Sequence, residues 1–198
     1  DALGSLLFEA ITKLPESYPT RTEADILSAN ARAIAQAIGA VDTLVDLGAG
    51  NCAKALHLIP SLQPQRYVGV DISVDFLEKG LAEVQHQHPQ MGVTGLGLDF
   101  SSALSMPADM VQGRPVFFYP GSSIGNFTPE QAAVFLASVQ GQAREGGLLI
   151  GVDLIKDTAW LEPAYDDALG VTAAFNLNLL RHLNRLIDSN FDPRDWRH

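Results

Sequence analysis

The stretch "LVDLGAGNCAK", residues 44–54, is an apolar run that contains an acid and is followed by two glycines, Gly48 and Gly50, and a lysine. Glycine has no Cβ, so the backbone at these positions can take positive φ and bring bare peptide groups close to a ligand. The pattern predicts a strand that stops at a sharp turn and presents that turn to a bound molecule. A tight strand-to-helix turn without a ligand is the alternative interpretation.

Further short runs rich in Val, Ile, Leu and Phe follow along the chain, and segments of helical period lie between them. The predicted strands are residues 43–47, 66–71, 92–99, 115–120 and 147–155. The predicted helices between them are about residues 53–59, 74–87 and 129–144. Strands that are apolar on both faces and alternate with helices are typical of a parallel sheet covered on both sides. We therefore expect a doubly wound α/β fold, in which ligands bind beyond the carboxyl ends of the strands.

The segments before and after this pattern are expected to be helical. A short helix is predicted over residues 3–14 and a longer one over about 22–38, with Thr20 as its N-cap and Glu23 as the capping-box partner. The tail from residue 158 is mostly helical in pattern, with an apolar stripe that we expect to pack in the core. The stripe consists of Phe175, Leu179, Leu183 and Leu186. The expected division is an N-terminal helical segment, residues 1–41, and a sheet domain, residues 42–198.

The charge balance argues against several classes of partner. The 198 residues include 13 Lys and Arg against 23 Asp and Glu, a formal net charge of -10, so the field of the protein repels nucleic acid and anionic membrane surfaces. A single cysteine, Cys52, cannot form an internal disulfide, which fits a reducing compartment. No run approaches the roughly 18 apolar residues of a membrane span, and the first residues do not resemble a secretory signal. We expect a cytoplasmic enzyme or binding protein.

Acidic residues also end the next two predicted strands. Asp71 lies 21 residues after Gly50, where its carboxylate can accept hydrogen bonds from both hydroxyls of a ribose. Asp99 ends the third strand and can accept a hydrogen bond from an adenine amine, while the adjacent Phe100 covers the ring. A solvated strand end for Asp71 and a helix N-cap for Asp99 are the alternatives. Together with Asp46 in the first strand, these acids indicate an adenosine-containing ligand.

NAD and S-adenosylmethionine both contain adenosine, and the glycine turn is compatible with either. NAD places a pyrophosphate at the first helix N-terminus, whereas the tail of S-adenosylmethionine carries a carboxylate and an ammonium. Acids around the site suit the cationic cofactor, and Lys54 can reach the carboxylate of its tail. The residues favour S-adenosylmethionine, and an NAD-dependent oxidoreductase is the weaker interpretation because no hydride-transfer partner is evident.

The loop after the fourth predicted strand supplies small polar groups rather than a proton shuttle. It reads "GSSIGNFTP", residues 121–129, and a helix is expected from about Pro129 with Thr128 as its N-cap. We expect this loop, with Gly121, Ser122 and Asn126, to face the site. A pure turn role is the alternative for Asn126.

Several stretches, taken in order, resemble one known family over nearly the whole chain. They are "LPESYPTRTEADIL", "LVDLGAGNCAK", "YVGVDIS", "GLDFS", "GSSIGNFTP", "GVDLIKD" and "AYDDALGVTAAFNLNLLRHLNR". In this order they are similar to the histidine-specific, S-adenosylmethionine-dependent methyltransferases of ergothioneine biosynthesis, which trimethylate the α-amino group of histidine. The resemblance implies a Rossmann-like class I methyltransferase fold with an N-terminal helical segment.

The resemblance also implies roles for individual residues. Around the cofactor it implies Gly48, Lys54, Asp71, Asp99, Phe100 and Gly121, to which the motifs above add Gly50 and Ser122. It implies that Asn126 and Tyr165 hold the polar head of the amino acid, since an amide and a phenol can orient a carboxylate or an amine without adding charge. A surface aromatic on a helix is the alternative for Tyr165.

The chain departs from the family pattern in three respects. Ser17 precedes Tyr18 where the family has two consecutive tyrosines, the first of which is associated with the imidazole side of the substrate. The chain begins after a family segment that contributes another tyrosine, and it ends before strands that complete the sheet and contact the imidazole. The resemblance therefore implies a truncated chain that lacks C-terminal strands, with an exposed sheet edge through which a homodimer can form.

The expected activity is methyl transfer to the α-amino group of histidine or a related small amino acid. A neutral amine attacks the sulfonium methyl in line, so positioning rather than a special general base is expected to supply the rate. The alternatives are a methyltransferase-like binding module without turnover and a methyltransferase for another small amine. No metal is expected, because the histidines are scattered and His86 and His88 do not share a helix face.

Overall fold

The computed structural model describes residues 1–100 and 104–198, and these form two compact units. The sheet unit comprises Glu23–Asp153, and the helical unit joins Asp1–Thr22 to Leu154–His198. The predicted boundary between residues 41 and 42 stays a prediction, while packing groups residues 23–41 with the sheet. In the described ranges, no helix has both the length and the apolar character needed to span a bilayer.

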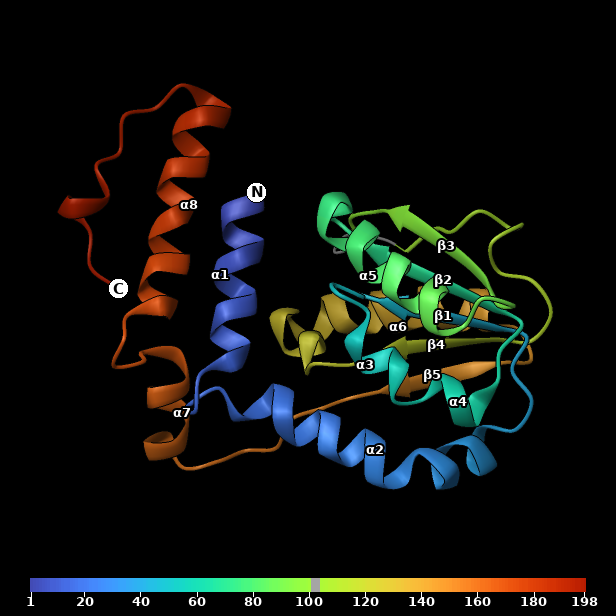
Figure 1. Ribbon diagram of the computed structural model, residues 1–198. Coiled ribbons are helices and arrows are strands. Elements are labelled where there is room, and N and C mark those ends of the chain that lie inside the picture. Colours follow the sequence, from blue (N-terminus) through green and yellow to red (C-terminus); the bar gives the residue numbers. More distant parts are fainter. Residues whose placement is uncertain (101–103) are drawn as a thin grey trace. The chain divides into compact units, whose positions relative to one another are not determined.

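The sheet unit is built on five parallel strands in the order β3-β2-β1-β4-β5 (Figure 1). The strands are β1 (Thr43–Leu47), β2 (Arg66–Asp71), β3 (Gly92–Gly97), β4 (Pro115–Tyr119) and β5 (Gly147–Ile150). Every residue of β1 and of β4 is buried, because helices cover both faces of the sheet. The predicted α/β fold with a parallel sheet is confirmed.

Side chains alternate between the two faces of the sheet and form two separate cores. The helices of this unit are α2 (Tyr18–Ile38), of which the part from Glu23 onward belongs here, α3 (Ala53–Leu56), α4 (Ile59–Leu62), α5 (Val74–Gln87) and α6 (Pro129–Ala143). On one face, Leu44 and Phe118 belong to the core formed with α2 to α5, and on the other, Val45 and Phe117 pack with α6. The chain order reverses between β1 and β4, where sheets of this kind bind ligands.

Helix α2 begins at Tyr18, earlier than predicted. Thr20 therefore lies inside the helix, and the predictions of Thr20 as N-cap and of its capping box with Glu23 are wrong. The reason is Pro19, whose fixed φ suits the first turn of a helix, where its missing N–H needs no partner. Glu23 has no capping role, and its carboxylate instead accepts the N–H of Gly121.

Other boundaries also differ from the prediction. β3 ends at Gly97 rather than at residue 99, because its partner strand β2 ends at Asp71, which pairs with Gly97, so the prediction that Asp99 ends the third strand is wrong. Residues 53–59 do not form one helix, because Pro60 belongs to the first turn of α4 and is not tolerated in a continuous helix interior. β5 ends at Ile150 rather than at residue 155, because the chain turns toward the loop after β4. There the N–H of Asp153 donates to Oγ of Ser122, at 3.0 Å, rather than to a neighbouring strand.

The helical unit is held together by the packing of its first helix against its longest one. Its elements are α1 (Ala2–Lys13), α7 (Thr158–Tyr165), α8 (Val171–Ile187) and the short 3-10 turn η2 (Pro193–Asp195). α1 and α8 lie side by side, with the ring centroids of Phe8 and Phe175 6.0 Å apart (Figure 1). The amide of Asn178 donates to Asp1 Oδ1 at 2.9 Å, so a polar contact also joins the two helices.

The apolar stripe predicted on α8 is not a continuous core face. Phe175 and Leu183 are half-buried, but Leu179 and Leu186 are 58% and 64% exposed, so the prediction of core packing is wrong for these two residues. The reason is the rotation of α8, which turns the side chain of Asn178 inward instead. Hydrophobic spacing alone does not show which side of a helix meets its neighbour.

Asp167 is a buried residue that caps the start of α8. Its carboxylate accepts the N–H groups of Leu169 at 3.1 Å, Val171 at 3.0 Å and Thr172 at 2.8 Å. Burial alone would raise the pKa of Asp167, but these hydrogen bonds outweigh it and lower the pKa to about 2. This acid of the "AYDD" stretch therefore has a structural role in the helical unit.

Replacing Asp167 with asparagine is expected to lower the free energy of unfolding by about 1–2 kcal/mol at neutral pH, as the loss of a good cap does. The folded pKa, about 2, lies below the ordinary value of 3.8, so the carboxylate stabilises the fold above the ordinary value. That contribution disappears as the pH falls from about 4 toward 2. Urea unfolding at several pH values should show the gap between wild type and variant closing over this window. Asp166→Asn, an exposed neighbour, is the control, and a gap independent of pH would contradict the capping role.

Candidate functional site

A cleft of about 250 Å³ lies at the carboxyl ends of β1 to β4 in the sheet unit. Its lining residues are Gly48, Asp71, Ile72, Leu98, Asp99, Phe100, Tyr119, Ser123, Asn126 and Phe127. The cleft thus brings together predicted site residues that are far apart in the sequence: Gly48, Asp71, Asp99, Phe100 and Asn126. Their individual roles stay predictions, but they share one cavity.

The turn after β1 is held against β2 by its own amides. The N–H of Gly48 donates to the carbonyl of Val70 at 2.9 Å, and the N–H of Gly50 donates to Asp71 Oδ2 at 2.9 Å. Gly48 and Gly50 have φ of +72° and +54°, a region that side chains with a Cβ rarely adopt. A Cβ at Gly48 would lie 3.9 Å from the ring of Phe100, so its absence keeps this part of the cleft open. The predicted sharp turn is confirmed.

Asp71 ties two segments together at the edge of the cleft. Besides Gly50, its carboxylate accepts the N–H of Ser73 through Oδ1 at 2.8 Å, at the start of α5. A carboxylate offers about four acceptor positions, so this one can still accept two further hydrogen bonds. The side chain therefore has the capacity that a diol such as ribose requires, in a fixed orientation.

One wall of the cleft is aromatic. The rings of Phe100 and Tyr119 meet edge to face with centroids 6.0 Å apart, and Phe135 packs behind Tyr119 at 4.8 Å. Burial raises the pKa of Tyr119, so its hydroxyl stays neutral. An aromatic, uncharged wall of this kind suits a flat ring such as a nucleobase.

Asp46, the residue before the last in β1, is a buried acid with incomplete hydrogen bonding. Its Oδ2 accepts the hydroxyl of Tyr67 at 2.7 Å, whereas Oδ1 has no hydrogen-bond partner among the described residues. The pKa of Asp46 is raised to about 7: burial raises it most, the Tyr67 hydrogen bond and the charge of Lys54 lower it, and the charges of Asp71 and Glu23 raise it further. The acids outnumber the lysine here, so a cationic ligand would stabilise this region.

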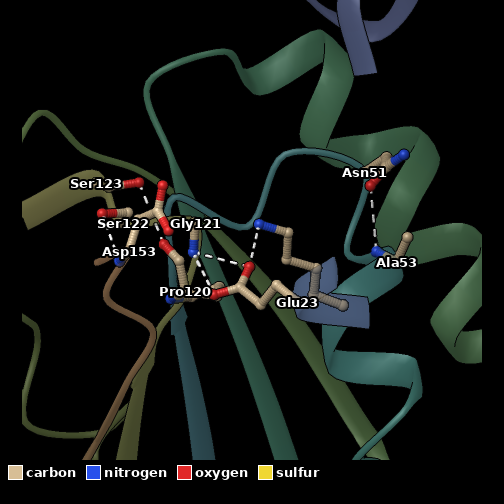
Figure 2. A network of polar contacts seen from close by, with 9 residues as sticks. Glu23, Asn51, Ala53, Pro120, Gly121, Ser122, Ser123 and Asp153 are labelled. Carbon is tan, nitrogen blue, oxygen red and sulfur yellow. Dashed lines mark hydrogen bonds and ion pairs between the residues drawn. The ribbon is translucent and has the colours of Figure 1, made fainter. Parts of the chain in front are cut away.

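Lys54 and Gly121 meet through a residue that the sequence-based site did not include (Figure 2). Nζ of Lys54 lies 2.5 Å from Oε2 of Glu23, and the N–H of Gly121 reaches both oxygens of the same carboxylate, at 2.8 and 2.9 Å. The three residues come from α3, α2 and the loop after β4. Lys54 is therefore an ion-paired residue beside the cleft rather than part of its lining.

The loop after β4 contributes small polar side chains to the cleft. Ser122 adopts a φ of 55° and its hydroxyl accepts the N–H of Asp153, while Ser123 and Asn126 bound the 3-10 turn η1 (Ser123–Asn126) and line the cleft. Thr128 is the N-cap of α6, as predicted, and it also forms a capping box with Gln131. Ser122 thus supports the loop, and Ser123 takes the place in the cleft that the sequence-based site gave to Ser122.

Tyr165 belongs to the helical unit, at the end of α7, where its side chain is 68% exposed. Its carbonyl oxygen accepts a hydrogen bond from Nε2 of His198 at 2.7 Å. Its role toward an amino-acid substrate stays a prediction. The helix N-cap considered as an alternative for Asp99 concerns residues 101–103, which lie outside the described part of the chain.

Several residues around the cleft were missed by the sequence-based site. They are Ile72, Leu98, Tyr119, Ser123, Phe127 and, behind the lining, Glu23. Ile72, Leu98 and Tyr119 end a strand or follow one directly, so extending the strand-end rule by one residue would have found them. Glu23 carries no such signal, because in the sequence it lies on a helix that is distant from every strand end, although it contacts Gly121 in the structure. Over residues 1–100 and 104–198, no group of three His, Cys, Asp or Glu side chains could hold a metal ion.

The geometry agrees with a comparison against protein families. The model of the family "histidine-specific methyltransferase, SAM-dependent" matches residues 1–198. The chain belongs to this family. The family resemblance recognised in the sequence is therefore confirmed.

Individual relatives of this methyltransferase-family chain are similar over its whole length. Histidine N-alpha-methyltransferase of Mycobacterium tuberculosis is 41% identical over 204 residues, which cover 100% of this chain and 62% of the relative. Ergothioneine biosynthesis protein 1 of Neurospora crassa is 36% identical, over 98% of this chain and 23% of that protein. The chain thus spans about 62% of the length of the mycobacterial protein.

A solved structure supports the fold of the chain. N-methyltransferase NodS from Bradyrhizobium japonicum, in complex with S-adenosyl-L-homocysteine, superposes with a TM-score of 0.52 over 83% of this chain and 77% of NodS. The sequence identity is 11%, so this likeness concerns the fold alone.

Proposed function

We propose that this chain binds S-adenosylmethionine and transfers its methyl group to the α-amino group of histidine or a related small amino acid. The observation that carries the proposal is the cleft, in which the glycine turn, Asp71 and the aromatic wall meet in a chain of a histidine-specific methyltransferase family. The 41% identity with a histidine N-alpha-methyltransferase supports the choice of substrate.

The residues at the cleft fit this cofactor. Gly48 leaves open the space that a Cβ would fill in front of Phe100, and Asp71 retains acceptor capacity for two hydroxyls. Asp46, whose Oδ1 has no hydrogen-bond partner among the described residues, and the neighbouring acids favour a ligand that carries positive charge. A pyrophosphate cofactor such as NAD would place negative charge among these acids, which disfavours it.

Each group has a defined task in this proposal. Asp71 accepts the ribose hydroxyls, Asp99 and Phe100 hold the adenine edge and face, and Lys54 attracts the carboxylate of the methionine tail. When bound, S-adenosylmethionine supplies an electrophilic methyl group on a sulfonium. From the loop of Gly121 to Asn126, the side chains of Ser123 and Asn126 line the cleft.

In this proposal, neutral polar groups hold the acceptor amino acid. Asn126 lines the cleft, and the role of Tyr165 is the one that the family resemblance implies. An amide and a phenol can orient the amine without raising its pKa, so the amine can lose its proton to solvent before it reacts. Holding two reactants in line can supply roughly 7 to 11 kcal/mol of the barrier, so no general base is required. Tyr119, whose hydroxyl stays neutral, is not suited to that task at neutral pH.

Calorimetry tests the proposal with this chain. S-adenosylhomocysteine is expected to bind, and histidine is expected to strengthen its binding, because both ligands meet in one site. Mass spectrometry of histidine incubated with S-adenosylmethionine and the chain should then detect methylated histidine. Binding of the cofactor product without any methylated amine, over a panel of amino acids, would instead favour a binding module without turnover. Absence of S-adenosylhomocysteine binding would overturn the proposal.

A second candidate is the same reaction on another small amine. It is favoured by Ser17, which is buried at a position where the family resemblance implies an aromatic residue on the imidazole side of the substrate. The amino-acid panel distinguishes the two, because preference for a different amine would identify that acceptor. Homodimerisation and a cytoplasmic location stay predictions.

A further inference from the structure

Glu23 and Lys54 form a pair of opposite charges next to the predicted cofactor cleft (Figure 2). A second contact holds the pair in place, because both oxygens of the Glu23 carboxylate also accept the N–H of Gly121. The side chains are mostly shielded from solvent, with 15% of Glu23 and 26% of Lys54 exposed. A surface ion pair would have no such backbone anchor, so this arrangement is built rather than incidental.

The pair adjoins the cleft wall through Gly121. A Cβ at Gly121 would lie 3.0 Å from Nζ of Lys54 and 3.3 Å from Oγ of Ser123, which lines the cleft. Gly121 therefore lies between Lys54 of the ion pair and Ser123 of the cleft wall. The charges of Glu23 and Lys54 also act on Asp46, which places them near the glycine turn.

Both members of the pair retain hydrogen-bonding capacity. An ammonium has three donors, and Lys54 uses one on Glu23, while a carboxylate has about four acceptor positions, of which Glu23 uses three. The pair can therefore receive one further anionic group at Lys54 and one further cationic group at Glu23 without being broken. In a zwitterionic α-amino acid, these two groups are bonded to the same carbon, so they lie side by side.

We propose that Glu23 is a cofactor-binding residue, which accepts a hydrogen bond from the α-ammonium of the S-adenosylmethionine tail while Lys54 donates to the α-carboxylate. This inference rests on the proposed function, since it names the side chains that bind the amino-acid end of the same cofactor. It explains why the lysine of this site is paired with an acid: a lone lysine would attract the carboxylate but repel the ammonium beside it.

The test compares two ligands that differ in the amino-acid end. S-adenosylhomocysteine carries the zwitterionic head, whereas 5′-methylthioadenosine has the same adenosine and thioether without it. Glu23→Gln keeps the size of the side chain and one carbonyl oxygen for the Gly121 N–H. By calorimetry, we expect this variant to bind S-adenosylhomocysteine at least ~10-fold more weakly than wild type, the cost of one charged hydrogen bond. Its affinity for 5′-methylthioadenosine should stay within about twofold of wild type.

The outcomes separate this inference from the proposed function. An equal loss for both ligands would mean that Glu23 only supports the fold of the loop, and no loss for either would mean that it does not contact the ligand, and each result overturns the inference. If wild type binds neither ligand, the proposed function fails instead. Asp25→Asn, two residues further along α2 and exposed, removes the same charge and should change neither affinity. Thermal unfolding of each variant shows that the fold is retained.

Discussion

Replacing Asp71 with alanine is expected to weaken the binding of S-adenosylhomocysteine by at least ~100-fold. The carboxylate holds the N–H groups of Gly50 and Ser73, and in the proposed function it also accepts two ribose hydroxyls. Each hydrogen bond to a charged group contributes about 1.5–3 kcal/mol, so loss of the ligand contacts alone exceeds a factor of a hundred. Isothermal calorimetry of the variant with S-adenosylhomocysteine measures the change directly.

The control for this variant is Asp75→Asn, which removes an equal charge from the exposed first turn of α5. It should leave the affinity within about threefold of wild type, because a screened surface charge contributes little. Thermal unfolding must show that the Asp71 variant is folded, since this side chain also anchors the glycine turn. A folded Asp71→Ala protein with near-normal affinity would exclude the assignment of the ribose to this site.

Much of the fold could be predicted because short sequence patterns indicate the strands and the helices between them. Each strand is a short apolar run. Such runs predict strands that are buried on both faces, and the parallel sheet inferred from them is the one observed. The errors fall at boundaries that depend on particular contacts. Pro19 is in the first turn of α2 rather than before it, and β5 ends where Ser122 takes the N–H of Asp153. The Pro19 signal is present in the sequence, because proline suits the first turn of a helix, whereas the contact between Ser122 and Asp153 is not, because it joins residues 31 apart.

The site was predictable to the extent that it follows strand ends. Gly48, Asp71 and Asp99 lie directly after β1, at the end of β2 and shortly after β3, so the topology of a parallel sheet brings them into one cleft. Glu23 could not be found in this way, because it lies 98 residues before its partner Gly121 and its spacing resembles a capping box. The raised pKa of Asp46 likewise depends on burial, which a single acid in a strand does not reveal.

The second large effect is expected at Gly80, on the buried side of α5. A Cβ there would lie 2.6 Å from the carbonyl carbon of Asn51 and 2.8 Å from Sγ of Cys52, in the turn that follows β1. Because backbone atoms cannot rotate away, Gly80→Ala must displace either the helix or the turn. Overpacking of this kind costs about 1–3 kcal/mol, and occasionally more, which exceeds the gain in helix propensity of about 1 kcal/mol.

Gly141→Ala provides a matched control with the opposite expected sign. Gly141 is also helical, near the end of α6, but a Cβ there would meet no heavy atom within 4 Å. Urea unfolding should show a net loss of up to about 2 kcal/mol for Gly80→Ala and a gain of up to about 1 kcal/mol for Gly141→Ala. Since the displaced turn includes the residues next to Gly50, Gly80→Ala should also weaken S-adenosylhomocysteine binding, whereas Gly141→Ala should not. If both variants are stabilised alike, the close approach of α5 to the glycine turn does not exist in solution, because in that case only helix propensity decides the sign.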